Sequence, residues 1–240
     1  MKAVLEVNNL SKKYKDRFAV ENITFAGYEG EVLGFLGPNG AGKTTTIRMI
    51  TGLIKPNSGN VLINGHSVTK DFEEAIKNVG AIVETPHLYE YMTGLDNINL
   101  FAKLKKATSE QIKRSIQITG LEEELKRKVK NYSLGMKQRL AIGIALLGEP
   151  KLLILDEPSN GLDPFGIKEL RILLKDLAHN EGICIVISSH LLQEMQLTCD
   201  RAVIIAKGKI LGEVNVSNIN DEGKSLEDVF IELTKGEQKR

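Results

Sequence analysis

The stretch GPNGAGKTT, residues 37–45, decides the fold of this chain. It fits the pattern G-x-x-x-x-G-K-[ST], which forms a loop around phosphate groups when a strand precedes it and a helix follows it. The apolar run EVLGFLG (31–37) predicts the strand, and TTTIRMITGL (44–53) predicts the helix, with Ile47 and Ile50 on one face. The context that the pattern requires is therefore present, and the alternative is a plain turn with a structural lysine.

The residue types in this loop suit phosphate binding. Its glycines let backbone N–H groups surround the phosphates, and the helix that begins near Lys43 adds the positive end of its dipole. We expect Lys43 to reach the β and γ oxygens and Thr44 to offer its hydroxyl to Mg²⁺. The residues expected to bind the nucleotide here are Gly37, Pro38, Asn39, Gly40, Ala41, Gly42, Lys43, Thr44 and Thr45.

Short apolar runs recur along the rest of the chain. Helical segments separate several of them, and this alternation favours an α/β fold with a mixed, mostly parallel sheet. Near the N-terminus two runs alternate as half-buried strands do, joined by the charged SKKYKDR (11–17), which predicts an antiparallel β layer. The expected strands are AVLEVNNL (3–10), FAVENITFA (18–26), NVLING (60–65), VGAIV (79–83), KLLILD (151–156), GICIVIS (182–188) and RAVIIA (201–206).

The segment from about 86 to 149 is rich in helical patterns and contains no convincing buried strand. We therefore expect a single domain over residues 1–220. Its α/β core comprises about 1–85 and 150–220, and the helical segment is a subdomain inserted between the phosphate loop and the later strands.

Residues 221–240 are expected to form a C-terminal helix and a tail. In SLEDVFIELT, Leu226, Phe230 and Leu233 fall on one helical face. The last residues, GEQKR (236–240), predict a disordered end.

Two adjacent acids end a buried strand in LLILDEP (152–158). Burying a pair of charges is costly without a cation or a partner, so we expect Asp156 to hold Mg²⁺ directly or through water. Glu157 lies one residue further, where it can accept a hydrogen bond from a water that attacks the γ-phosphate. The alternative is that these acids cap the following turn.

Two other polar side chains also follow apolar strands. A lone histidine in this position is usually structural, but beside a phosphate loop and an acid pair we expect His190 to contact the γ-phosphate. Glu84 directly follows the strand at 79–83, before Thr85 and Pro86 stop it. Because ligands are held at the carboxyl ends of strands in α/β sheets, Glu84 is either a solvated strand end or part of the site.

The composition excludes several classes of protein. Of 240 residues, 42% are hydrophobic, which is enough for one large domain, and 32 basic against 31 acidic residues give a net charge of +1. This balance lacks the basic footprint of a nucleic-acid binder. The longest run without a polar side chain, 140–148, is far below the ~20 residues of a membrane span, and the N-terminus resembles a strand rather than a signal peptide. Cys184 and Cys199 are expected to be packing residues.

The segment NYSLGMKQRLAIGIALL (131–147) separates subfamilies of such proteins. Ser133 and Gly135 lie where an amphipathic helix with Leu140, Ile144 and Leu147 on one face begins, so its amino end suits an anion. Taken alone, an ordinary N-cap explains this pattern equally well. Together with the loop and the acids, however, the whole arrangement resembles the ATP-binding cassette family, the ATPase subunits of ABC transporters.

The resemblance covers nearly the whole chain and implies a nucleoside triphosphatase of the P-loop class that uses ATP and Mg²⁺. The family's serine-glycine signature is similar to YSLGM (132–136), with Leu134 and Met136 in place of its usual glycine and glutamine, and SNGLD (159–163) matches its D-loop. In the family two cassettes pair head to tail, and each signature closes over ATP on the other. The resemblance thus places Ser133 and Gly135 at the nucleotide of a second copy, in an expected homodimer.

Two further residues take roles from the resemblance. Tyr14 is where the family places an aromatic ring on the adenine; its alternative is packing in the hairpin. At Glu84 the family usually has a glutamine that contacts Mg²⁺ and senses the membrane partner. A carboxylate oxygen also suits Mg²⁺, although it cannot donate the amide's hydrogen bond. We therefore expect Glu84 to act in catalysis and in metal binding.

The glutamate in VETPHLYEYMTGLDN (83–97), with SLGMKQR and DEPSNGLDP, resembles the bacitracin-resistance and lantibiotic-immunity cassettes. This implies an ATPase that drives a separate transmembrane permease, held on the cytoplasmic face of the membrane through it. A second hypothesis is a soluble, non-transport ABC ATPase of DNA repair or translation, but the joined cassettes or long insertions usual there are absent. A P-loop GTPase or kinase would leave the signature unexplained, and no Asn-Lys-x-Asp motif occurs.

Overall fold

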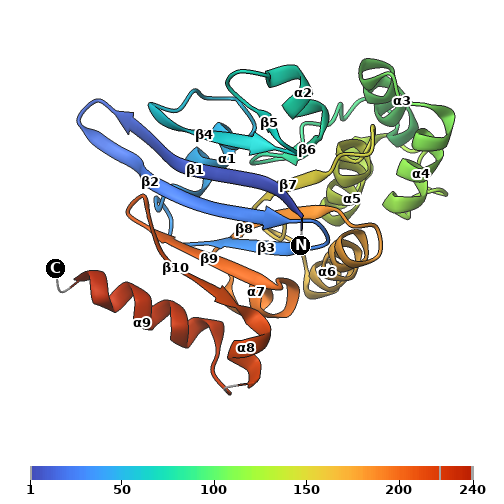
Figure 1. Cartoon of the computed structure of the whole chain (residues 1–240). Coiled ribbons are helices and arrows are strands. Elements are labelled where there is room, and N and C mark those ends of the chain that lie inside the picture. Colours follow the sequence, from blue (N-terminus) through green and yellow to red (C-terminus); the bar gives the residue numbers. More distant parts are fainter. Residues whose placement is uncertain (1, 222, 239–240) are drawn as a thin grey trace.

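The computed structural model describes residues 2–221 and 223–238, which form two β-sheets with helices around them (Figure 1). In spatial order, the larger sheet contains β10 (Lys209–Asn215), β9 (Arg201–Ala206), β3 (Val32–Leu36), β8 (Cys184–Ser189), β7 (Leu152–Asp156) and β6 (Val79–Ile82). The strands from β9 to β6 are parallel, and β10 is antiparallel to β9. The prediction of a mixed, mostly parallel sheet is confirmed.

The second sheet is the predicted antiparallel layer. It contains β2 (Arg17–Tyr28), β1 (Ala3–Tyr14), β4 (Ser58–Ile63) and β5 (His66–Ser67) in this order. Strands β1 and β2 are longer than predicted, because SKKYKDR continues both strands and leaves Lys15 and Asp16 as the turn. Lys15 has a φ of 51°, the left-handed conformation that tight hairpin turns need.

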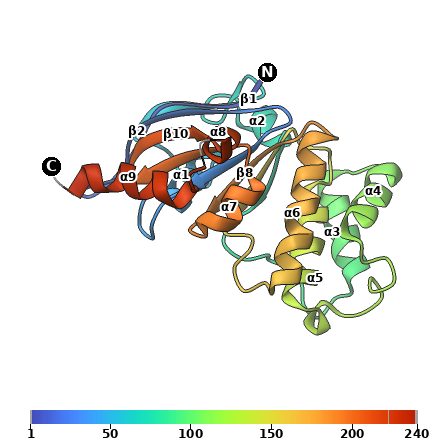
Figure 2. The ribbon, with the colours of Figure 1, turned by 90° about the horizontal axis from the view of Figure 1, so that it is seen from below.

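The helices of the segment predicted to be helical form a lobe beside the sheets (Figure 2). They are α3 (Gly94–Lys105), α4 (Ser109–Thr119), the short 3₁₀ helix η1 (Val129–Asn131) and α5 (Leu134–Ala145). Thr93 and Thr108 are the N-caps of α3 and α4, and their side chains accept a backbone N–H in a capping box. A separate apolar cluster that includes Ile98, Leu125 and Leu140 holds the lobe together. The limits of this subdomain, about 86 and 149, stay a prediction.

The other helices are α1 (Lys43–Ile50), α2 (Phe72–Lys77), α6 (Pro164–His179), α7 (Leu192–Thr198), α8 (Val216–Asp221) and α9 (Leu226–Gln238). Together with the antiparallel sheet they cover both faces of the larger sheet. Leu33 and Phe35 of β3 pack in the cluster with α1 and the antiparallel sheet, and Leu36 packs in the cluster with α6 and α7. Since both faces are covered, β3, β7 and β8 are buried along their whole length.

The structure differs from the sequence predictions in three places. Residues 236–238 belong to α9, so the predicted disorder of GEQKR is wrong there, and its residues 239 and 240 lie outside the described residues. Leu147 is buried in the lobe's cluster but follows the end of α5. Strands β5 and β10 were not predicted, because β5 has two residues and no residue of β10 is buried.

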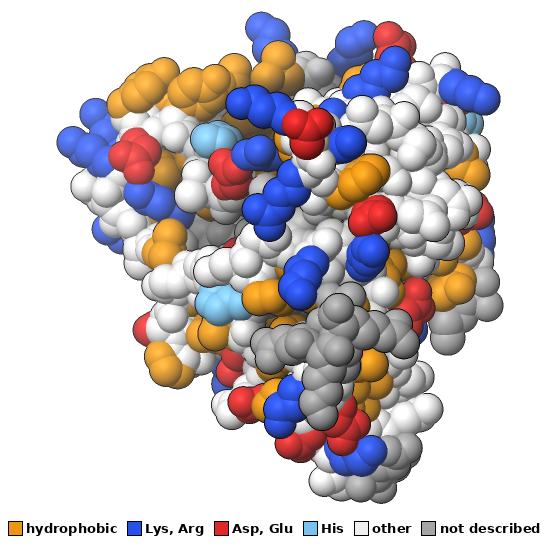
Figure 3. Space-filling view, turned by 90° about the vertical axis from the view of Figure 1, so that its left-hand side faces the viewer, with side chains coloured by type: hydrophobic (Ala, Val, Ile, Leu, Met, Phe, Trp, Pro, Cys, Tyr) orange, Lys and Arg blue, Asp and Glu red, His pale blue; other side chains and the backbone are white. Residues whose placement is uncertain are grey.

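Within residues 2–221 and 223–238, no helix has the length and apolar character that crossing a membrane requires. On the face shown in Figure 3, Lys and Arg side chains are interspersed with Asp and Glu, in keeping with the small net charge.

Candidate functional site

Strand order brings the predicted site residues to one edge of the larger sheet. Strands β3, β8 and β7 are neighbours and parallel, so their carboxyl ends lie side by side. The loop at 37–42 follows β3, His190 follows β8, and Asp156 ends β7. Residues far apart in the sequence therefore meet at one place, as in other α/β sheets.

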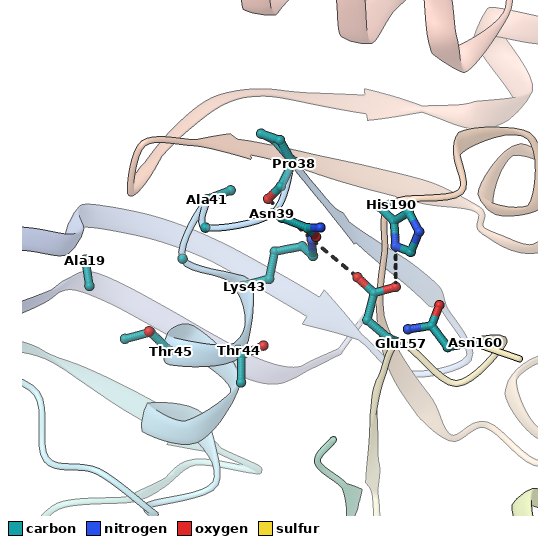
Figure 4. A pocket seen from close by; sticks show the side chains of 12 residues that line it. Ala19, Pro38, Asn39, Ala41, Lys43, Thr44, Thr45, Glu157, Asn160 and His190 are labelled. Atoms are coloured by element: carbon teal, nitrogen blue, oxygen red, sulfur yellow. Dashed lines mark hydrogen bonds and ion pairs between the residues drawn. The ribbon is translucent and has the colours of Figure 1, made fainter. Parts of the chain in front are cut away.

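A cavity of about 350 Å³ opens at this edge (Figure 4). Residues 38–45 line it, and Glu157 and His190 lie across from the loop. Gly37 does not line the cavity, but its carbonyl accepts a hydrogen bond from Lys43 Nζ. The structure thus brings together the whole predicted loop and two of the predicted catalytic residues.

Glycine is required at two positions of the loop by close backbone contacts. A Cβ at Gly37 would lie 2.2 Å from the carbonyl oxygen of Ile205. Gly42 has a φ of 109°, and a Cβ there would lie 2.6 Å from the carbonyl oxygen of Ala19. Because the chain can pass only without side chains, the loop wraps tightly and delivers Lys43 at the first turn of α1.

The ammonium group of Lys43 is buried and held by oxygens. Its Nζ donates to the carbonyl of Gly37 at 2.7 Å and lies 3.5 Å from that of Pro38. It also forms an ion pair with Glu157, 3.4 Å from Oε1. This cation lies in the cavity with a carboxylate as its counterion, so phosphate oxygens entering there can replace that counterion.

Asp156 does not line the cavity itself but lies between two hydroxyl groups, one of which belongs to the cavity residue Thr44. Thr44 Oγ1 donates to its Oδ2 at 3.1 Å, and Ser188 Oγ donates to its Oδ1 at 2.5 Å. The carboxylate is almost fully buried. A buried acid with a hydroxyl beside it fits Mg²⁺, which prefers oxygen ligands and commonly takes one or two from a protein, with phosphates and water completing the shell. Accordingly, the described residues contain no cluster of three or more His, Cys, Asp or Glu that would enclose a metal.

Glu157 is held by a partner on each carboxylate oxygen. Oε1 faces Lys43, and Oε2 lies 2.8 Å from Nδ1 of His190, as Figure 4 shows. The backbone of Glu157 has a φ of 51°, a strained conformation for a residue other than glycine. Its carboxylate therefore points into the cavity, where a water beside a phosphate would lie.

Glu84 is not brought into this cavity. Its φ is 68°, and its half-exposed carboxylate forms an ion pair with Arg48 of α1. Together with Val83 and His87, these two residues line a different hollow of about 490 Å³. The structure keeps Glu84 at the strand end as predicted, but its carboxylate pairs with Arg48 while Thr44 and Asp156 contact each other. Its role with Mg²⁺ stays a prediction.

Ser133, Gly135 and Tyr14 also lie outside the cavity. Ser133 is the N-cap of α5 and accepts the backbone N–H of Met136 at 3.2 Å. A Cβ added at Gly135 would make ordinary van der Waals contact with Leu162 at 3.8 Å, so the position does not require glycine for lack of space. Tyr14 is 49% exposed near the end of β1, with Lys12 Nζ 5.4 Å from its ring, so packing in the hairpin does not bury it.

Sequence reasoning missed two residues that line the cavity, Ala19 and Asn160. Ala19 lies in the long strand β2, where a small partly buried residue gives no signal. Asn160 was seen only as part of SNGLD, and Figure 4 shows it beside Glu157.

Comparison with known proteins agrees with this geometry. The ABC transporter family model matches residues 20–160. The uncharacterized ABC transporter ATP-binding protein YhcH of Bacillus subtilis (strain 168) is 49% identical over 96% of this chain and 75% of its own length. The bacitracin transport ATP-binding protein BcrA of Bacillus licheniformis is 43% identical (93% and 74%). The lantibiotic transport ATP-binding protein SrtF of Streptococcus pyogenes is 38% identical (95% and 96%).

A solved structure extends the comparison to the fold. The dimeric post-hydrolysis state of the ATP-binding cassette MJ0796, bound to ADP and Pi, aligns with a TM-score of 0.78 at 26% identity, covering 88% of this chain and 98% of that one. The chain therefore belongs to the ABC transporter family, as one of its ATP-binding cassettes, which hydrolyse ATP.

Proposed function

We propose that this chain powers a separate transmembrane permease that exports or clears a peptide antibiotic of the bacitracin or lantibiotic type. Two relatives named for bacitracin and lantibiotic transport match more than nine tenths of the chain, and this observation carries the proposal. It favours transport over a role in DNA repair or translation. Through the permease, the chain would lie at the cytoplasmic face of the membrane.

Binding is assigned to the phosphate loop. Its backbone N–H groups and the first turn of α1 would surround the phosphates, while Lys43 exchanges the Glu157 carboxylate for β and γ oxygens. Tyr14, exposed near the end of β1, would stack on the adenine ring. The triphosphate would thus be fixed before any step of hydrolysis.

Mg²⁺ would be held by Thr44 and Asp156, and when bound it would neutralise charge on the β and γ phosphates. Asp156 already accepts a hydrogen bond from the Thr44 hydroxyl, so the two side chains face the same point. Glu84 would join them only after it leaves Arg48.

Hydrolysis is assigned to Glu157, with His190 as its partner. Once Lys43 has turned to the phosphates, Glu157 Oε1 is free to accept a hydrogen bond from the attacking water and orient it toward the γ-phosphate. His190 Nδ1 keeps the other carboxylate oxygen in place at 2.8 Å, and because His190 lines the cavity, its ring would contact the γ-phosphate.

A second copy would complete the site. Ser133 and Gly135 lie at an exposed helix amino end away from the copy's own cavity. In a head-to-tail homodimer the hydroxyl and N–H groups there would face the γ-phosphate held by the other copy. They would supply donors to the charge that develops in the transition state.

The experiment is a pull-down of the tagged chain from its native membrane, combined with bacitracin and lantibiotic sensitivity of a strain that lacks it. We expect a multi-span membrane protein to co-purify and the strain to become sensitive. The Glu157→Gln chain is the matched control, which should co-purify equally and fail to restore resistance. Recovery of ribosomes or DNA in place of a membrane protein, or unchanged resistance to both antibiotics, would reject the transport proposal.

A further inference from the structure

The hydroxyl group of Ser188 lies between the two acids of the site. Ser188 is the last residue but one of β8, pairs with Asp156 of β7, and has no exposed surface. Its Oγ donates to Asp156 Oδ1 at 2.5 Å and accepts the backbone N–H of Glu157 at 3.0 Å. A serine hydroxyl has one proton to donate and can accept in return, so one group serves both acids.

The first contact fixes the Asp156 carboxylate. Thr44 holds Oδ2 and Ser188 holds Oδ1, so rotation of the carboxylate would break a hydrogen bond on either side. Because the group is buried, water cannot replace a lost partner at low cost. The Asp156 carboxylate assigned to Mg²⁺ is therefore held in one orientation by a residue of the neighbouring strand β8.

The second contact fixes the backbone of Glu157. Its N–H is shared between Ser188 Oγ at 3.0 Å and the Ser188 carbonyl at 3.1 Å. The residue is held at a φ of 51°, and its side chain points to Lys43 and His190. Without the hydroxyl, one of the two bonds that hold this strained backbone is lost.

We infer that Ser188 is a positioning residue for ATP hydrolysis, which aligns the metal-side acid Asp156 and the proposed water-orienting acid Glu157 through a single hydroxyl. The inference rests on the roles proposed above for these two acids. Ser188 does not line the phosphate cavity, so it acts through its partners.

The test compares variants that differ in the hydroxyl rather than in size. Ser188→Ala removes it, and Ser188→Cys replaces it by a thiol of similar shape that is a weak donor and acceptor. Ser188→Thr keeps it. Ser115→Ala is the stability control, because Ser115 is equally buried in the helical lobe and its Oγ donates to the Gly143 carbonyl at 2.8 Å, far from the acids in the fold.

Two measurements are needed, the ATPase rate and the Mg²⁺ concentration at which a fluorescent ATP analogue is half-bound in a Glu157→Gln background. Loss of an outer partner of a metal ligand commonly costs about 10–100-fold in affinity or rate. We expect Ser188→Ala and Ser188→Cys to lose about 10-fold or more in turnover and to raise the Mg²⁺ midpoint by a similar factor. Binding of the analogue without Mg²⁺ should not change, and Ser188→Thr should retain most of the turnover.

The outcomes separate this inference from the proposed function. If Asp156→Asn and Glu157→Gln left hydrolysis intact, the assignment of the acids would fail. If both abolished it while Ser188→Ala and Ser188→Cys kept the wild-type rate and Mg²⁺ midpoint, only the role of Ser188 would be overturned. The role of Ser188 would also be overturned if the ATPase rate fell only in proportion to the melting temperature and Ser115→Ala lost as much activity. That is the pattern expected of a purely structural hydroxyl.

Discussion

Replacing Arg48 by glutamine should lower the Mg²⁺ concentration that ATP hydrolysis requires. Arg48 forms an ion pair with Glu84 outside the phosphate cavity, and Glu84 must leave this partner before its carboxylate can approach Mg²⁺. Removing the guanidinium removes the competing interaction. The free energy of the ion pair then appears as tighter binding of the metal by the nucleotide complex.

The exposure of the pair limits the size of the effect. The two side chains are 41% and 53% exposed, and pairs of this kind contribute about 0.2–1 kcal/mol. Since 1.4 kcal/mol corresponds to a factor of ten, the Mg²⁺ midpoint should fall by a factor of at most about five. Stability should change by no more than the same amount, so the variant remains folded.

The assay is the ATPase rate against Mg²⁺ concentration. Glu84→Ala should raise the Mg²⁺ requirement and clearly lower turnover, whereas Glu84→Gln should keep substantial activity, because its amide oxygen can still coordinate. In the Glu84→Ala background, Arg48→Gln should have no further effect. Lys77→Gln is the matched control, since it removes a similarly exposed cation that pairs with Glu74 on α2.

Two results would refute this reasoning. If the ATPase rate depended on Mg²⁺ concentration identically in Glu84→Ala and the wild type, Glu84 would be a solvated strand end without a role in metal binding. A higher Mg²⁺ requirement in Arg48→Gln would mean that the arginine supports the active arrangement rather than competing with it.

Three further predictions concern binding, stability and pH. Lys43→Ala should weaken binding of an ATP analogue and abolish turnover. Ser133→Ala should spare binding and lower turnover, because Ser133 lies outside the cavity of its own copy. Equal losses of affinity in the two variants would mean that the assignment of Ser133 to the second copy's nucleotide is wrong. Arg201→Met should lower the free energy of unfolding by about 3 kcal/mol in urea, because the buried Glu31 loses a bidentate partner at 2.8 and 3.2 Å; an unchanged midpoint would contradict this. Burial holds the pKa of Lys105 below 10.5, so the unfolded chain binds more protons between the two pKa values and stability rises with pH there. Urea unfolding should show that the wild type gains stability relative to Lys105→Met between pH 7 and pH 10. A difference in unfolding free energy between the two proteins that is the same at both pH values would reject this prediction.

The sequence allowed most of the cavity residues to be predicted, all but Ala19 and Asn160, because local patterns determine them. The glycines of the loop are needed where backbones touch, as at Gly37, and parallel strands buried on both faces require uninterrupted apolar runs. The carboxyl ends of β3, β7 and β8 could be located to within one residue, and a parallel sheet places such ends at one edge. That is why Lys43, Glu157 and His190 were predicted together and are found together.

The remaining contacts depend on neighbours that no local pattern specifies. The pairing of Glu84 with Arg48 joins a strand end to α1, and the contact of Ser188 with Asp156 requires knowing that β8 lies next to β7. Ser133 lies outside the cavity of its own copy, and only the family resemblance gave it a place at the nucleotide.

The central claim is that ATP is bound between two copies of this chain and hydrolysed with the help of Glu157. Sedimentation velocity of Glu157→Gln with saturating ATP and Mg²⁺ tests it most directly, with the same variant without nucleotide, and with Lys43→Ala added, as controls. We predict a stable dimer with ATP and a monomer in both controls, because blocked hydrolysis leaves the γ-phosphate between the loop of one copy and Ser133 of the other. A monomer at ATP concentrations that saturate binding would contradict the claim.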